Sequence, residues 1–183
     1  MRKKIVIALG IAAACTLTGT AAAAPSAPAH PGGTVHIIDY IDNDNAITTA
    51  VVTGAVGDLG EGVSINSDGT LSTEHTELNM VLSQGTFRLN TAELDKNFIA
   101  AAGSTPFQHG PKSCSGFMTA SAPVPIVAGS GTGAYRGISG TFQLTMTAGE
   151  VDVPTTNNRC DITGALLGQV IVTEGAATVS FAP

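Results

Sequence analysis

The chain is poor in the side chains that recognise rings and phosphate groups. Its 183 residues include no tryptophan and only two tyrosines, so any aromatic binding platform would be sparse. Eight lysine and arginine residues stand against 14 acidic ones, for a net charge of −6, and the basic residues are scattered. Such a surface repels phosphate backbones and anionic lipid headgroups. We therefore expect neither nucleic acid nor a membrane surface as a partner.

The motifs of common catalytic and metal sites are also missing. The histidines show neither HxH nor HExxH spacing, and there is no CxxC pair, so zinc is unsupported. No GxSxG nucleophile elbow is present, and the Gly-Ser-Gly at 129–131 is not one. The polar run 42–45 hints at calcium, but Ala46 and Ile47 occupy the next ligand and glycine places of an EF-hand. A solvated turn is the better interpretation, and we expect no metal and no cofactor.

The N-terminus has the three parts of a secretory signal. Basic residues at 2–4 precede an apolar run over 5–15, and a stretch rich in alanine and proline follows at 21–29. The apolar run is too short for a membrane span, which needs about 20 apolar residues. We expect a secreted or cell-envelope protein that has no transmembrane helix once the signal is removed.

This interpretation divides the chain into three parts. Residues 1–29 are the expected signal peptide, 30–33 a flexible leader, and 34–183 a single β-barrel domain. Cleavage within 21–24 is a close alternative. Attachment of a lipid to Cys15 is a second alternative, which would anchor the protein to the envelope.

Cys114 and Cys160 are the two cysteines that remain after cleavage. An even number of cysteines in an oxidising compartment indicates a disulfide. A metal pair or a reactive thiol is the rival interpretation, but neither cysteine has a histidine close by in sequence. We expect one bond between these two residues.

Strands account for most of the remaining sequence. From Thr141 to Thr147, polar residues at odd positions alternate with Phe142, Leu144 and Met146, which is the period of a strand with one polar face. We expect 57–62 to be a loop and Asn66–Gly69 a hairpin turn. The expected strand segments cover 34–41, 47–56, 63–65, 71–73, 78–83, 86–89, 114–119, 125–128, 141–151 and 168–181. Because several of these ten segments are only three or four residues long, they amount to about eight strands, which favours a barrel or a sandwich.

One helix is expected over 91–102. Asn90 can cap it, Glu93 stands at the third helical position of a capping box, and Gly103 is placed to end it. Its apolar face is formed by residues spaced four apart, with Ile99 beside them: Leu94, Phe98 and Ala102. We expect this helix to cover an open end of the barrel.

The most informative segment is GSGTGAYRGISG, Gly129 to Gly140, which leads into the strand at Thr141. Its glycines permit positive φ and close approach of strands, and Tyr135 can anchor the bend by packing inward. A phosphate-binding glycine loop would need a helix start and usually a lysine. Here a strand follows and no lysine is near, so the segment is structural.

This segment resembles the glycine-rich approach to a long strand in the allene oxide cyclase and dirigent barrels. The residues that match a GxGxYxGxxG-like pattern are Gly131, Gly133, Tyr135, Gly137 and Gly140. The final strand and the spacing of the two cysteines are similar to those of secreted bacterial relatives of these barrels. The resemblance implies an all-β fold, an eight-stranded antiparallel β-barrel of the allene oxide cyclase/dirigent type with one short helix.

The same resemblance points to one candidate cavity residue. In the plant cyclases the first strand presents a carboxylate and an amide on one face. An ungapped match of TVHIIDYID puts Ile37 and Asp39 at those places, so the carboxylate is lost and the amide has become an acid. Asp39 is the nearest candidate for the acidic cavity residue of dirigent-type barrels. The alternative is a polar side chain at the barrel rim.

Three functions follow from these observations. The leading one is a non-enzymatic barrel that holds a small apolar ligand, with no catalytic residue. The second is a cyclase or isomerase that steers a reactive intermediate, and the third is a protein that interacts through its outer surface. An acidic residue pointing into a closed apolar cavity would favour the second, and an interior filled by side chains would favour the third.

Overall fold

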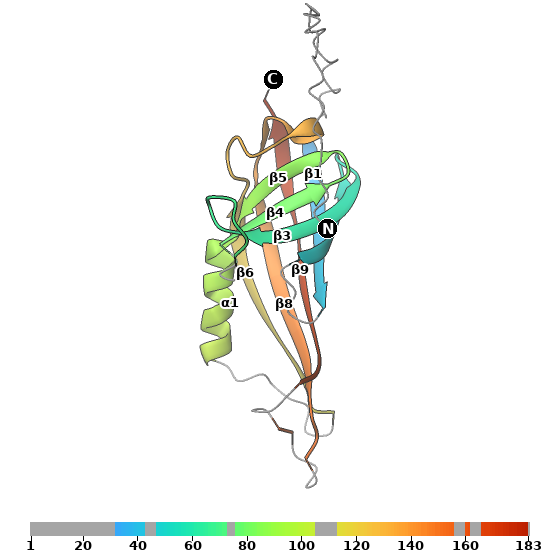
Figure 1. Cartoon of the computed structure of the whole chain (residues 1–183), viewed down its shortest axis with the longest axis vertical. Helices are drawn as coiled ribbons and strands as arrows, with labels where there is room; N and C mark the ends of the chain where they lie inside the picture. The colour runs from blue at the N-terminus through green and yellow to red at the C-terminus, as the bar shows by residue number, and fades with distance from the viewer. Residues whose placement is uncertain are drawn as a thin grey trace, which may run out of the picture.

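In a computed structural model of the chain, antiparallel strands dominate (Figure 1). The structure describes residues 32–42, 47–72, 76–104, 113–155, 160–161 and 166–182. The strands are β1 (Gly33–Asp42), β2 (Ile47–Gly54), β3 (Asp58–Ile65), β4 (Glu77–Leu82), β5 (Gly85–Asn90), β6 (Ser115–Pro125), β7 (Ile138–Ser139), β8 (Thr141–Asp152) and β9 (Leu166–Phe181). They are joined by helix α1 (Ala92–Ser104) and a short 3₁₀ helix, η1 (Gly133–Tyr135).

Eight of these strands form one antiparallel sheet in the order β5-β4-β3-β2-β1-β9-β8-β6, and β7 pairs with β9. The sheet curls into a half-barrel, so it has a concave inner face and a convex outer face. This arrangement confirms the expected antiparallel β architecture with one helix. Strand β1 pairs with β9, so the first and last strands of the sequence lie side by side in the sheet.

The two edges of the sheet meet at one end of the half-barrel. Leu89 of β5 forms an antiparallel bridge with Ile126, which directly follows β6. The backbone N–H of Val127 donates to the carbonyl of Arg88 at 2.8 Å, and that of Thr132 donates to Thr86 at 2.8 Å. We call this end, with its bridge at Leu89, the closed end. Away from it the edges separate, and α1 packs against β6 on that side.

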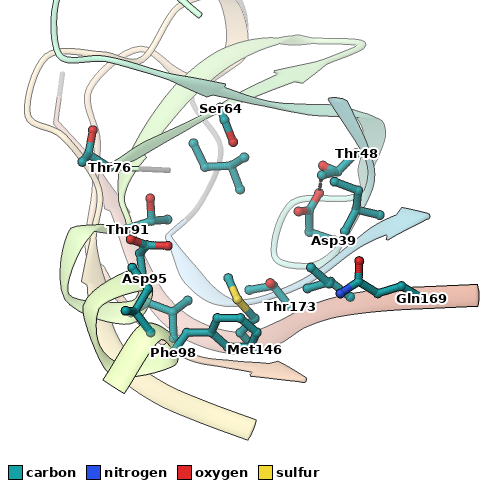
Figure 2. Close-up of a pocket in the computed structure, with 15 residues that line it drawn as sticks. Asp39, Thr48, Ser64, Thr76, Thr91, Asp95, Phe98, Met146, Gln169 and Thr173 are labelled. Atoms are coloured by element: carbon teal, nitrogen blue, oxygen red, sulfur yellow. Dashed lines mark hydrogen bonds between the residues drawn. The ribbon is translucent and has the colours of Figure 1, made fainter. Parts of the chain in front are cut away.

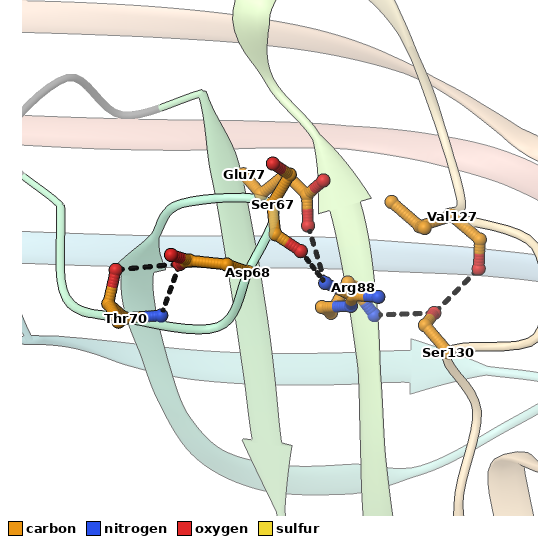
Figure 3. Close-up of polar contacts among 7 residues, drawn as sticks. All are labelled: Ser67, Asp68, Thr70, Glu77, Arg88, Val127 and Ser130. Carbon is orange, nitrogen blue, oxygen red and sulfur yellow. Dashed lines mark hydrogen bonds and ion pairs between the residues drawn. The ribbon is translucent and has the colours of Figure 1, made fainter.

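Arg88 ties the closed end to the neighbouring turn (Figure 3). Its guanidinium donates to the carbonyl of Ser67 at 3.2 Å and pairs with Glu77 at 3.0 Å. Its backbone N–H donates to the hydroxyl of Ser130 at 3.0 Å, and that hydroxyl donates to the carbonyl of Val127 at 2.6 Å. One residue of β5 therefore connects the turn after β3 with the segment after β6.

Side chains fill the closed end. Phe87, Leu89, Val124, Tyr135 and Phe142 are all buried at 1% exposure or less. The Tyr135 ring lies 5.1 Å from that of Phe87, centroid to centroid, and its hydroxyl donates to Asp58 at 2.7 Å. Burial alone would raise the pKa of Asp58, but hydrogen bonds from Ser83, Tyr135 and two backbone N–H groups lower it below its usual value. The glycine-rich segment therefore delivers Tyr135 as a buried, hydrogen-bonded anchor.

Two expected strand boundaries were wrong. Residues 58–62 belong to β3 and are not a loop, and the separate strand expected at 125–128 does not exist, because β6 runs unbroken to Pro125. Glycine usually weakens a strand, which is why the sequence indicated a loop. In the structure, however, any larger residue at Gly60 would clash, because a Cβ there would lie 2.1 Å from the carbonyl oxygen of Val81. Glycine is present there because β4 approaches so closely. Leu71 makes one bridge, with Ile65, and Thr73 lies outside the described residues.

The helix also differs from expectation at both ends. It begins at Ala92, whose N–H donates to the side-chain oxygen of Asn90 at 3.2 Å, so Asn90 caps it from one residue further out. Glu93 therefore occupies the second helical position, and its carboxylate pairs with Lys96 at 3.3 Å. Gly103 does not end the helix, because it lacks the positive φ of a terminating glycine and the helix continues to Ser104.

Cys114 and Cys160 are joined as a disulfide, with their Cα atoms 5.2 Å apart. Cys114 directly precedes β6, and Cys160 forms a bridge with Pro154 beyond the end of β8. The bond thus ties together the ends of two paired strands and is compatible with an extracellular location. Within the described ranges, no helix is long and apolar enough to cross a membrane.

Candidate functional site

A cavity of about 690 Å³ lies on the concave face, between α1 and the inner faces of β1, β2 and β9 (Figure 2). Its apolar wall is formed by Ile41, Leu78, Leu94, Phe98, Met146 and Ile171. Polar side chains interrupt this wall at Asp39, Thr48, Ser64, Asp95 and Thr173, among others. The volume is in the range of protein sites for small organic molecules.

Where the core gives way to the cavity, three neighbouring strands change their inward residues from apolar to polar. Alternation along β1 points Val35, Ile37 and Asp39 to the same face. The first two pack in the core, and Asp39 reaches the cavity. The same change occurs on β2, from Val52 and Ala50 to Thr48, and on β9, from Val179 and Ala177 to Thr173. Since Asp39 is the register partner of Thr173, the polar residues form one layer beneath the core.

Asp39 is the most deeply buried acid in this layer, at 6% exposure. One carboxylate oxygen accepts a short hydrogen bond from the Thr48 hydroxyl, and the other points toward the open space (Figure 2). Burial raises the pKa of Asp39 to about 6, although the bond from Thr48 lowers it. Gly62 leaves room for this carboxylate, because a Cβ there would lie 2.9 Å from its oxygen.

The cavity lining carries acidic but no basic side chains among the residues that the structure describes. Asp39 and Asp95 are its two titratable groups, and it includes no lysine, arginine or histidine. The nearest basic residue on α1, Lys96, pairs instead with Glu93 on the exposed face of the helix. The described lining residues that carry a charge when ionised are therefore both acidic.

Of the residues identified from the sequence as candidates, only some lie at the cavity. Asp39 lines the cavity, whereas Ile37, its partner in the match to the plant cyclases, is packed in the core at 1% exposure. The glycine-rich segment and the disulfide do not contribute to the lining. His36 is exposed, and His75, His109 and residues 43–45 of the polar run lie outside the described residues. No group of three metal-binding side chains occurs in the part of the chain that is described.

Sequence reasoning missed Thr48, Asp95 and Thr173. Thr48 and Thr173 carried one usable signal, since each is a polar residue in phase with apolar inward residues of its own strand. Asp95 carried none, because an acidic residue in the first turn of a helix is ordinary.

Comparisons of the chain with protein-family models, with curated proteins and with solved structures find no match. The functional argument therefore rests on the cavity itself.

Replacement of Asp39 by asparagine should stabilise the protein in a pH-dependent way. The pKa is about 6 in the folded chain against an ordinary value of 3.8, so folding favours the protonated form. The stability that the protein has with Asp39 protonated is fully present below the ordinary pKa and is lost as the pH rises through 6. Asparagine stays neutral at every pH, so its advantage should grow by about 2 kcal/mol between pH 4 and pH 8. Urea unfolding of both proteins at the two pH values measures this, and a constant difference would contradict it.

Proposed function

We propose that this protein is an exported, non-enzymatic barrel that binds a small, largely apolar molecule. The observation that carries the proposal is the cavity of about 690 Å³ beneath an otherwise packed core. Most of its wall surface is apolar, and polar side chains such as Asp39, Thr48 and Thr173 can orient a ligand. A cavity of this kind in a half-barrel is suited to holding a molecule away from water.

The fold assignment to the allene oxide cyclase and dirigent barrels belongs to this proposal. It is supported by the glycine pattern from Gly131 to Gly140, which precedes the long strand β8, and by the curled eight-stranded sheet with one helix. Export is supported by the signal-like residues 1–29 and by the bond between Cys114 and Cys160. The alternative form of export is a protein anchored to the envelope by a lipid on Cys15.

One observation favours a second function, that of a cyclase or isomerase. Asp39 is a buried carboxyl group in a largely apolar cavity, and its pKa of about 6 suits a general acid or base near neutral pH. Incubation with an unstable fatty-acid epoxide, followed by chiral analysis of the cyclised product, separates the two functions. A racemic product is expected, and an enantiomeric excess that disappears in Asp39→Asn would make the protein an enzyme.

Binding of a neutral apolar dye, N-phenyl-1-naphthylamine, tests the proposed function. Thr173→Phe adds an aromatic ring inside the cavity and should weaken dye binding by about tenfold or more, which corresponds to about 1.4 kcal/mol. The matched control is Val172→Phe, which adds the same ring one residue away on the opposite face of β9. Thermal melts establish that both variants are folded. Equal dye affinity in the two variants would contradict the proposal.

A further inference from the structure

The cavity presents a buried carboxylate, and no described residue of the lining supplies a cation to accompany it. Asp39 is 6% exposed, and Thr48 is its one hydrogen-bonding side chain among the described residues. The hydroxyl of Thr48 satisfies one oxygen, while the second oxygen points into the cavity. An ionised carboxylate taken out of water without a cation is unfavourable, and a positively charged group placed beside it offsets that penalty.

The surroundings of Asp39 indicate that a charged group on a ligand would have to be positive. Among the residues that the structure describes, the elements packed around Asp39 bring one further titratable group to the cavity, Asp95 of α1, and no basic side chain. On β8, Glu150 is the register partner of Gln169, which lines the cavity, so the next charged group along that strand is also acidic. A carboxylate on a ligand would meet repulsion there and find no partner among the described lining residues.

On the basis of the ligand-binding function proposed above, we propose that the cavity selects molecules with a protonated amine on an apolar body, and that Asp39 binds the ammonium group. The ammonium donates a charge-assisted hydrogen bond to the free oxygen of Asp39, and such bonds are roughly twice as strong as neutral ones. The apolar body packs against the wall that includes Leu94, Phe98 and Ile171. A hydroxyl in place of the amine can donate to the same oxygen, but it brings no positive charge to the buried carboxylate.

Three eight-carbon probes that differ in the head group test this selectivity: octylamine, 1-octanol and octanoate. Calorimetric titration of the exported protein at pH 7.5 should give about tenfold tighter binding of octylamine than of octanol, with octanoate weakest. Asp39→Asn should remove the advantage of octylamine over octanol. The matched control, Glu174→Gln, removes the same charge from an exposed position on the outer face of β9 and should preserve the advantage.

The pH dependence of the unmutated protein gives a second, independent measurement. Protonation of Asp39 as the pH falls from 7.5 to 5 should weaken octylamine binding by about tenfold and should weaken octanol binding much less. Equal affinity for all three probes, tighter binding of octanoate, or an amine preference that survives in Asp39→Asn would overturn the inference while leaving the binding function intact. Failure of all three probes to bind would instead overturn the proposed function, and the inference with it.

Discussion

Replacement of Cys114 or Cys160 by alanine is expected to lower the free energy of unfolding by about 4 kcal/mol. The two residues lie 46 positions apart, and on the chain-entropy model a cross-link that closes a loop of this length stabilises by that amount. The bond also holds the start of β6 against the segment that follows β8, next to the hydrogen bond from the Asp152 N–H to the Cys114 carbonyl at 2.8 Å. Urea unfolding of the exported protein without reductant measures the loss.

The double variant provides the control for this prediction. Both single variants break the same bond, so the pair together should lose about as much as either alone. Reductant should lower the stability of the unmutated protein and leave the variants unchanged. Losses that add in the double variant, or two free thiols in exported protein, would contradict the bond.

Gly133→Ala should be the second most damaging of these changes, at about 3 kcal/mol. The residue has a φ of 56°, in the region where an L side chain is strained by about 1–2 kcal/mol. Its Cβ would also lie 2.3 Å from the carbonyl oxygen of Gln84, where η1 packs on β5, and overpacking of this kind costs about another 1–3 kcal/mol. Gly137, with a φ of 75° and a Cβ position 2.3 Å from the Ala182 oxygen, should behave similarly.

Gly129→Ala separates strain from close approach. Gly129 has a φ of 72°, but a Cβ there would meet nothing within 4 Å. It should therefore lose only the strain, about 1–2 kcal/mol. Thermal melts of the three variants test this order, and a Gly133→Ala protein that melts with Gly129→Ala would show that the contact with β5 is not tight.

The strand pattern could be predicted wherever one face of a strand is buried and the other is not. Phe142 and Leu144 of β8 are buried, and Thr141 and Gln143 between them are exposed, as their alternation indicates. The start of β3 could not be predicted, because Gly60 is required by the close approach of Val81 on β4, which lies outside the local sequence around Gly60. Local composition contains no record of such a close approach.

The cavity could be anticipated only in part for the same reason. Asp39 is in phase with the buried Val35 and Ile37, so its inward direction follows once β1 is known to face a core. Its position opposite Thr173 depends on the pairing of β1 with β9, which come from opposite ends of the chain. Nothing local to either strand specifies that pairing.

The most direct test of the binding cavity is methyl NMR of the folded protein titrated with N-phenyl-1-naphthylamine. Ring-current shifts are expected at Leu78, Leu94 and Ile171, which line the cavity, and not at Val124 in the packed closed end. Shifts confined to the outward-facing Ile38, Val51 and Leu59 would contradict the binding cavity and place the interaction on the outer surface of the sheet.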